Sequence, residues 1–380
     1  MERRPYFGRA KRVVVKVGSN VLTGTNGLDT GLIASLARQI SEMTGRGLEV
    51  LLVSSGAMAA GQKKMEIACR PEDIPGRQAV AAIGQAGLML AYETAFATHG
   101  RKVAQILLTI DDLRANRRRY LNARNTINTL ISWLVIPVIN ENDTVAVDEI
   151  RFGDNDNLSA LIALMMDADL LINLTDIDGL YTGNPRTEKT AEKISLVPGV
   201  TRRIERYASG IPGTLGTGGM LTKIKAAKKI TAAGIPMVIA DGHAKNILIR
   251  LFSGEILGTF FMPAESKLSN RKCWIGFTLK PKGSLSIDAG AGAAITGRGK
   301  SLLPGGIVGV TGEFAAGEPV EIVGADGVRL ATGLVNYNAA DIRKIMGNRT
   351  SSIKEILGQK PYDEVIHRNN MTVLGECLEQ

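Results

Sequence analysis

The sequence predicts an α/β fold: a doubly wound, mostly parallel sheet sandwiched by helices, followed by a small β-rich domain. Between residues 12 and 260, short apolar runs alternate with helical stretches, a pattern typical of strands buried on both faces of a parallel sheet. Residues 281–360 differ in composition, because they hold 15 of the 43 glycines, about twice the density of the rest of the chain. The sequence therefore divides into an α/β part and a later β part.

The predicted sheet is built from six apolar runs with helices between them. We expect strands at Val13–Val17, Val50–Val53, Val103–Leu108, Ile136–Ile139, Leu170–Leu174 and Met237–Ala240. We expect helices at Leu32–Met43, Gln78–Ala97, Leu158–Met166 and Leu221–Ala233. The alternation favours helix layers on both faces of the sheet, with ligands bound beyond the carboxyl ends of the strands.

The glycine-rich segment contains short β-branched runs, such as Ile307–Val310 and Pro319–Val323, separated by turns. This pattern predicts a small β-barrel or sandwich. We therefore divide the chain into a first domain over 1–265, a linker over 266–280, a second domain over 281–360 and a C-terminal tail over 361–380.

The composition is that of a globular protein with a basic excess. Lys and Arg number 46 against 37 Asp and Glu, a net charge of +9, and 44% of the residues are hydrophobic, which excludes disorder. Residues 281–360 carry a net charge of only +2. The basic excess therefore lies in the first domain, where an anionic small substrate can use it as readily as RNA can.

Cysteine spacing indicates the compartment. Cys69, Cys273 and Cys377 lie far apart and form no Cys-x-x-Cys pair. This spacing favours a reducing cytosol and argues against a disulfide framework or a cysteine-built zinc site. We also find no signal peptide and no apolar run long enough to span a membrane. The sequence predicts a cytoplasmic protein with no membrane part.

The expected strand ends carry small and polar residues. The loops that follow four of the strands contain Lys16 with Gly18-Ser19-Asn20, Ser54-Ser55-Gly56-Ala57, Asn140-Glu141-Asn142-Asp143, and Thr175-Asp176. Backbone amides at a strand-to-helix turn bind anions, because the helix N-terminus carries partial positive charge. Two such Gly/Ser loops indicate a polyphosphate ligand.

A glycine-rich string, Gly213 to Lys223, runs into a predicted helix. Alone it is as compatible with a flexible hinge as with a ligand site. Lys16 favours the ligand site, because Lys16 at a strand end and Lys223 at a helix start can approach the β- and γ-phosphates from two sides. The chain has neither a P-loop nor a dinucleotide fingerprint.

The string Gly153 to Ala160 places two carboxylates and two amides before an apolar helix. One interpretation makes Asp156 or Asn157 a helix N-cap and the other residues solvated turn residues. In the functional interpretation, one carboxylate holds both lysines and an amide hydrogen-bonds the substrate. For Asn140 to Asp143 we favour function, because this string directly follows a strand end.

Other candidate features point to no further chemistry. The basic run Arg114 to Arg124 is typical of a solvated helix face, with an anionic ligand, a neighbouring subunit or nucleic acid as alternatives. His99, His243 and His367 fit no triad or metal spacing. No Asp/Glu cage for a metal is evident, and serine-hydrolase and zinc mechanisms have no support.

Taken in order, these motifs resemble the amino acid kinase family over almost the whole chain. The matching stretches are Val15–Thr23, Val53–Gly61, Tyr120–Thr126, Pro137–Val147, Gly153–Ala160, Leu174–Asp176 and Gly216–Lys223. Residues 281–360 resemble the PUA domain that many members carry. The resemblance implies ATP-dependent phosphorylation of the γ-carboxylate of glutamate at the start of proline synthesis.

The resemblance also implies a role for each candidate residue. Lys16, Lys223 and Asp156 would be catalytic, with Asp156 orienting the two lysines. ATP would contact Lys16, Thr175, Asp176, Thr217, Gly218, Gly219, Met220, Leu221, Thr222 and Lys223, and glutamate would contact Ser55, Asp143 and Asn155. Mg²⁺ would arrive with ATP. Feedback inhibition by proline and a homo-oligomer are further expectations.

Two alternatives remain open at this point. The first is another kinase of the same family, acting on carbamate, acetylglutamate, aspartate or UMP. Asp143 favours an acceptor with a free amino group, because a carboxylate pairs with ammonium and is left unmatched by an N-acetyl amide. The second is an RNA-binding protein, since PUA domains occur in RNA-modifying enzymes. The +2 charge of residues 281–360 counts against it.

Overall fold

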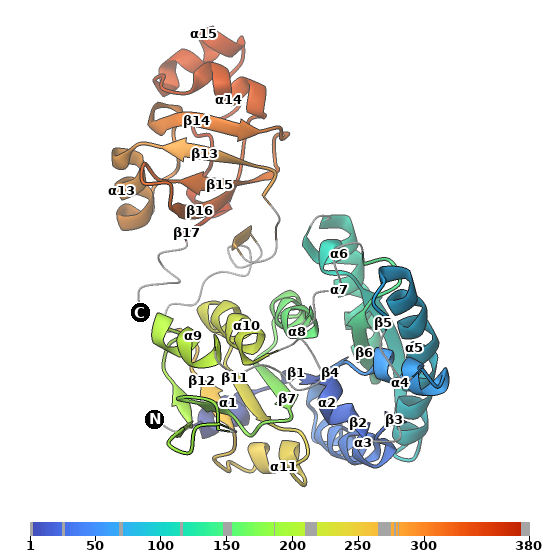
Figure 1. Cartoon of the computed structure of the whole chain (residues 1–380). Coiled ribbons are helices and arrows are strands. Elements are labelled where there is room, and N and C mark those ends of the chain that lie inside the picture. Colours follow the sequence, from blue (N-terminus) through green and yellow to red (C-terminus); the bar gives the residue numbers. More distant parts are fainter. Residues whose placement is uncertain are drawn as a thin grey trace. The chain divides into compact units, whose positions relative to one another are not determined.

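The chain divides into two compact units, Met1–Lys267 and Leu268–Gln380. The computed structural model describes residues 3–24, 27–67, 71–114, 117–146, 154–185, 187–209, 219–264, 275–276, 279 and 281–373 (Figure 1). Most of the predicted linker, the end of the predicted tail and all three cysteines lie outside these residues.

The described part of the first unit contains an eight-stranded sheet in the order β10-β12-β11-β7-β1-β4-β6-β5. Neighbouring strands are parallel except β11 and β12, which confirms the predicted mostly parallel sheet. The strands are β1 (Arg12–Val17), β4 (Glu49–Ser54), β5 (Lys102–Leu108), β6 (Val135–Glu141), β7 (Leu170–Thr175), β10 (Leu196–Val197), β11 (Met237–Asp241) and β12 (Thr259–Phe261). Two short hairpins add β2 (Thr23–Gly24) with β3 (Gly27–Leu28), and β8 (Leu180–Tyr181) with β9 (Lys193–Ile194).

Helices cover both faces of this sheet. They are α1 (Arg4–Arg9), α2 (Ser19–Leu22), α3 (Thr30–Gly45), α4 (Ala57–Lys64), α5 (Ile74–Ala97), α6 (Ile110–Arg114), α7 (Arg117–Ser132), α8 (Asp154–Met165), α9 (Arg202–Ser209), α10 (Met220–Ala232) and α11 (Ile247–Phe252). Helices α3, α5 and α11 contribute to the core on one face, and α7, α8 and α10 to the core on the other.

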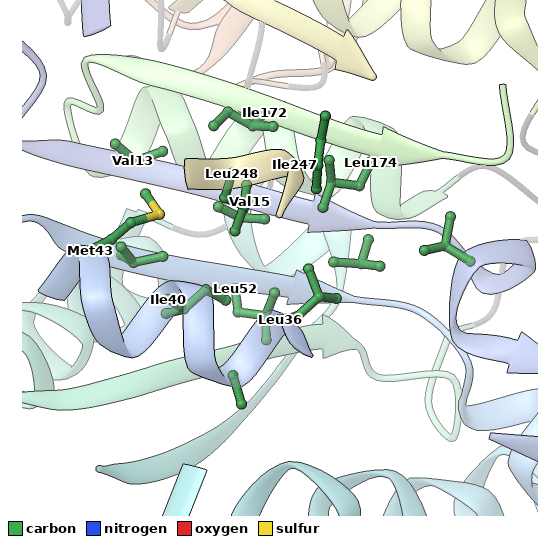
Figure 2. Packing of buried hydrophobic residues seen from close by; sticks show 14 of the residues in the cluster. Val13, Val15, Leu36, Ile40, Met43, Leu52, Ile172, Leu174, Ile247 and Leu248 are labelled. Carbon is green, nitrogen blue, oxygen red and sulfur yellow. The ribbon is translucent and has the colours of Figure 1, made fainter. Parts of the chain in front are cut away.

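Alternation along β1 explains why its sequence is continuously apolar. Val13 and Val15 join the core under α3 and α11, whereas Val14 joins the core under α8 and α10. Figure 2 shows the first of these cores, in which Val15 of β1 lies among side chains from the neighbouring strands and helices. The other residues labelled there are Val13, Leu36, Ile40, Met43, Leu52, Ile172, Leu174, Ile247 and Leu248. Both faces of the strand are buried, so no polar alternation appears.

Two helices begin earlier than the apolar pattern predicts, because a capping residue precedes each. Asp29 accepts a hydrogen bond from the Leu32 amide at 2.8 Å, so α3 begins at Thr30. Asp73 accepts one from the Gly76 amide, so α5 begins at Ile74. Capping side chains satisfy amides that the first helical turn leaves unpaired.

Among the described helices, α5 is long and apolar enough to cross a membrane, with a mean hydropathy of 1.2 over 18 residues. The core helix of a soluble protein meets the same criteria. In this structure α5 buries Leu88, Tyr92 and Phe96 and packs against α3, α4 and β5. Its apolar composition is therefore accounted for by packing.

The second unit has its own sheet and core. Its described sheet has five strands in the order β14-β13-β15-β16-β17: β13 (Gly283–Ile287), β14 (Ile307–Gly312), β15 (Pro319–Val323), β16 (Arg329–Leu334) and β17 (Met371–Val373). The helices are α13 (Ala289–Arg298), α14 (Ala339–Ile345) and α15 (Ile353–Leu357), with short 3₁₀ turns at Pro304–Gly306, Thr350–Ser352 and Arg368–Asn370. Sheet and helices share one buried cluster that includes Leu285 and Ile342.

The second unit is β-rich as predicted, but its helices were not expected from the sequence. Helix α13 is the clearest example, because its sequence AGAGAAITGR mixes three glycines with alanines and shows little apolar periodicity. Asp288 nevertheless caps it by accepting a hydrogen bond from the Ala291 amide at 2.7 Å. The cap starts a helix that composition alone does not reveal.

Helices α4 and α5 cross with their backbones in close contact. A Cβ atom on Gly84 of α5 would lie 1.8 Å from the carbonyl oxygen of Ala57 and 2.3 Å from the amide nitrogen of Gly61. Only glycine allows this approach. The crossing lies at the first residue of α4, directly after the loop that follows β4.

Replacing Gly84 with Ala should force α4 and α5 apart. We expect Gly84→Ala to lower the free energy of unfolding by about 1–3 kcal/mol, the usual cost of overpacking. Gly87→Ala on the same helix is the matched control, since a Cβ there meets nothing within 4 Å and alanine favours helix. Urea denaturation followed by circular dichroism measures both, and equal stabilities would contradict the close crossing.

Candidate active site

The polar loops predicted at strand ends lie along one edge of the sheet. Strands β7, β1, β4 and β6 are consecutive neighbours and run parallel, so their carboxyl ends meet there. Lys16 on β1 lies in register between Asn173 on β7 and Val53 on β4. Because all four ends share one edge, residues distant in sequence converge into a single site.

Asp156 on α8 lies at the centre of this site and joins three elements. Its Oδ1 is 2.5 Å from Lys16 Nζ, and its Oδ2 is 3.1 Å from Lys223 Nζ on α10. Thr222 Oγ1 donates to Oδ2 at 2.6 Å, and Asn173 Nδ2 donates to Oδ1 at 2.9 Å. The carboxylate has no exposed surface, and each lysine is only 4% exposed.

This arrangement excludes the interpretation of Asp156 as a simple helix N-cap. Helix α8 begins at Asp154, and both carboxylate oxygens of Asp156 are engaged by groups from other elements. The side-chain Oδ1 of Asn157 accepts a hydrogen bond from Lys229 Nζ of α10. The polar residues at the start of α8 therefore hold α10 in place.

The charges of the cluster explain the pKa values of its members. Burial alone would raise the pKa of Asp156, but the charges of Lys16 and Lys223 and their hydrogen bonds bring it well below its ordinary range. Burial lowers the pKa of Lys16, and the nearby Lys223 adds to that effect, while Asp156 and Asp176 oppose it. Lys16, Lys223 and Asp156 together carry a charge of +1, which the nearby carboxylate of Asp176 offsets.

Several of the residues predicted to contact ATP lie next to this cluster or belong to it. Asp176 accepts hydrogen bonds from Asn20 Nδ2 at 3.0 Å and from Thr175 Oγ1 at 3.1 Å, which links the loops after β1 and β7. Gly219 immediately precedes α10, and the side chain of Met220 is buried in the core. Leu221 packs partly against the same core. Thr217 and Gly218 lie outside the described residues.

A second polar cluster adjoins the first. Asn155, next to Asp156 in sequence, donates through Nδ2 to Ser55 Oγ at 2.9 Å, to Asn140 Oδ1 at 2.9 Å and to the Ser54 carbonyl oxygen at 3.3 Å. Its Oδ1 is buried and has no hydrogen-bond partner within the described part of the chain. The structure thus brings the predicted substrate residues Ser55 and Asn155 together and leaves one acceptor available.

The sequence identified some of the other residues in this region and missed one. Asp143 lies half-buried in the turn that follows β6. Asn140 belongs to a string that the sequence marked as functional, although it was not among the named site residues. Gln85, which accepts a hydrogen bond from Asn140 Nδ2 at 2.8 Å, gave no sequence signal, because it is an isolated polar residue in the central apolar stretch of α5.

Described members of the basic run and one histidine form ion pairs. Arg119 and Arg124 form ion pairs with Asp112 and Asp167 on the surface, at 2.7 and 2.6 Å. His243 is half exposed and pairs with Asp241 at the end of β11. Within the described residues, no group of three or more His, Cys, Asp or Glu could hold a metal ion.

A cavity of about 400 Å³ lies beside hairpin β8–β9 and α9. The residues that line it are Thr182, Gly183, Asn184, Glu188, Arg203, Arg206 and Tyr207. In the hairpin itself, Tyr181 and Lys193 donate hydrogen bonds to Asp178, both at 2.8 Å. None of the described residues predicted to contact ATP lines this cavity.

Comparison with known proteins gives consistent matches. The model of the amino acid kinase family matches residues 11–241, and the model of the PUA domain matches residues 283–357. A glutamate 5-kinase of Syntrophus aciditrophicus (strain SB) is 54% identical over 98% of this chain and 96% of its own length. A glutamate 5-kinase of Geobacter sp. (strain M21) is 51% identical over 98% of this chain and all of its own.

Removing the buried carboxylate should destabilise the first unit strongly. We expect Asp156→Asn to lower the free energy of unfolding at pH 7 by about 3–5 kcal/mol, because Lys16 and Lys223 lose their counter-charge in a buried site. Asp167→Asn, which breaks an exposed pair with Arg124, is the control and should cost less than about 1 kcal/mol.

The same comparison has a predicted pH dependence. The pKa of Asp156 is lower in the folded state than in the unfolded chain, so its stabilisation is fully present above the unfolded value of about 3.9 and is lost as the pH falls below it. The advantage of wild type over Asp156→Asn, measured by chemical denaturation, should therefore shrink between pH 5 and pH 3. A pH-independent difference would contradict this account of the cluster.

Proposed function

The chain belongs to the amino acid kinase family, and we propose that it transfers the γ-phosphoryl group of ATP to the γ-carboxylate of glutamate. About half of its residues are identical to those of glutamate 5-kinases over nearly the whole length, as the sequence motifs predict. This reaction is the first step of proline biosynthesis. The observation that carries the proposal is the buried Asp156, which holds two lysines next to the polar cluster around Asn155.

The acceptor in this reaction needs no general base. A γ-carboxylate has an unperturbed pKa of about 4.3 and is already ionised at neutral pH. The described residues of the cluster include no histidine, and the chemistry requires none. What the site must overcome is the repulsion between an anionic nucleophile and an anionic phosphoryl group.

Lys16 and Lys223 supply the opposing charge. Asp156 favours the protonated form of Lys16 despite its burial, and it fixes both ammonium groups before any substrate arrives. Preorganised charges of this kind stabilise a transferring phosphoryl group without reorganisation during the reaction. Asp156 therefore acts as a positioning residue and not as a base.

We assign the nucleotide to the edge formed by the loops after β1 and β7 and the start of α10. Thr175, Asp176 and the loop Thr217–Lys223 would contact ATP there. The oxygens of Asp156 and Asp176 already accept hydrogen bonds from other side chains, so they are poorly suited to form a metal cage. Mg²⁺ would therefore be held mainly by phosphates and water, which suits its preference for retained waters.

We assign glutamate to the cluster of Ser55, Asn155 and Asp143. The unpaired Oδ1 of Asn155 is an acceptor suited to a substrate donor such as an ammonium group. Asp143 would select against an acetylated amino group for the same reason that it favours ammonium. Feedback inhibition by proline, a smaller amino acid with a similar α-carbon, would act at or near this cluster.

The remaining assignments concern the whole chain. The catalytic work would lie in the first domain, 1–265, and the PUA domain, 281–360, would bind RNA weakly if at all, because its net charge is only +2. We expect a homo-oligomer in the cytoplasm, where ATP and glutamate are available.

A hydroxylamine-trapping assay tests the function directly, since an acyl phosphate product reacts with hydroxylamine to give a hydroxamate. With ATP present, we expect kcat/KM for glutamate to exceed that for acetylglutamate and aspartate by at least about tenfold. Asp143 would select against the acetylated amino group, and the spacing between the polar cluster and the lysines would select against the shorter side chain of aspartate. Equal or better turnover of acetylglutamate would assign the chain to another activity of the same family.

Lys223→Met tests the charge mechanism. The variant keeps the Lys16–Asp156 pair, so it should fold, yet kcat should fall by about two orders of magnitude or more. Lys223→Arg need not restore activity, since a planar fork differs from a point charge. Lys225→Met, at an exposed position on the same helix, is the control. A folded Lys223→Met enzyme with the kcat of the control would remove this lysine from the mechanism.

A further inference from the structure

Gln85 lies at the active site through the packing of α5. The adjacent Gly84 contacts Ala57, the first residue of α4, and Ser55 precedes that helix by two residues. The close crossing therefore brings Gln85 to the loop after β4. Gln85 is only 9% exposed, and its side chain faces Asn140 near the end of β6.

The orientation of the Gln85 amide follows from backbone groups. Asn140 Oδ1 accepts a hydrogen bond from the Glu141 backbone amide at 2.9 Å, so Asn140 must donate through Nδ2. Gln85 therefore accepts that bond through Oε1, at 2.8 Å. Its Nε2 is left as a buried donor with no hydrogen-bond partner in the described part of the chain.

An unpaired buried donor is costly, and its position indicates what it would meet. A donor without a partner costs about 1–3 kcal/mol, so such groups are normally satisfied by protein, water or ligand. The amide bears two N–H groups and repels ammonium, whereas a carboxylate accepts from it readily. A bound carboxylate is therefore the complementary ligand.

The position of Gln85 relative to the two lysines indicates which carboxylate of glutamate it would meet. Gln85 is linked to Asn140, and Asn140 to Asn155, which precedes Asp156 in sequence. The γ-carboxylate must reach the phosphoryl group near Asp156. Gln85 is separated from Asp156 by the amides of Asn140 and Asn155, so the carboxylate that it meets is the α-carboxylate. Resting on the proposed function, we propose that Gln85 Nε2 donates a hydrogen bond to the α-carboxylate of glutamate and so selects substrates with a free α-carboxylate.

Gln85→Glu separates this role from a purely structural one. The substitution keeps an oxygen that accepts from Asn140 Nδ2, but it replaces the donor with a second oxygen that repels a carboxylate. We expect KM for glutamate to rise by at least about tenfold, with KM for ATP within about twofold. Glu93→Gln, at an exposed position on the same helix, is the control and should change neither KM.

Isoglutamine, in which the α-carboxylate is an amide, gives a second readout. Its α-amide can donate to the new carboxylate, so Gln85→Glu should shift the ratio of kcat/KM values from glutamate towards isoglutamine by about 100-fold. The KM penalty for glutamate, relative to wild type, should also shrink as the pH is lowered towards 5, because protonation of the new carboxyl restores a donor. A residue that only supports Asn140 would produce neither change.

The outcomes are distinguishable. Wild-type turnover of glutamate, together with an unchanged KM and an unchanged isoglutamine ratio in Gln85→Glu, would overturn the role of Gln85 and leave the proposed function standing. Equal rises in both KM values with a lower melting temperature would make Gln85 a structural residue and also overturn the proposal. Wild-type protein that neither binds nor phosphorylates glutamate would refute the proposed function, and this proposal with it.

Discussion

The buried carboxylate of Asp156 is the constraint on which the first unit depends. Two ammonium groups, from Lys16 on β1 and Lys223 on α10, lie in a site that water hardly reaches, and neither would be tolerated there without an opposing charge. The same carboxylate ties β1, α8 and α10 together. In the proposed mechanism, the residue that holds the two lysine charges also holds the elements that carry them, so stability and catalysis would depend on one group.

The sheet edge separates two tasks that phosphorylation of an amino acid requires. In the proposed reaction, the lysines and the start of α10 would present positive charge to phosphates, whereas the amides of Asn155, Asn140 and Gln85 would present neutral donors and acceptors to an amino acid. Gln85 belongs to α5, whose close crossing with α4 requires glycine at position 84. In the proposed reaction, packing of α5 on α4 would thus contribute to recognition of the acceptor, and Asn155, next to Asp156 in sequence, joins the neutral and charged halves of the site.

The sequence predicted the sheet well because β1, β4 and β7 are buried on both faces, which leaves an unbroken apolar run for each strand. The helix starts were less predictable, since they depend on capping by Asp29 and Asp73. The role of Asp156 could not be decided from local sequence: a carboxylate near a helix start is common, and its partner Lys223 is 67 residues away. Gln85 was missed because an isolated polar residue in an apolar stretch carries no pattern.

The central claim is that Asp156 presents both lysines to the transferring phosphoryl group. A crystal structure of the full chain with glutamate, Mg²⁺ and a non-hydrolysable ATP analogue tests it most directly. We predict that Nζ of Lys16 and of Lys223 each lie about 2.7–3.2 Å from a β- or γ-phosphate oxygen while Asp156 still contacts both. A complex in which either ammonium group contacts only Asp156 and faces away from the phosphates would contradict the account.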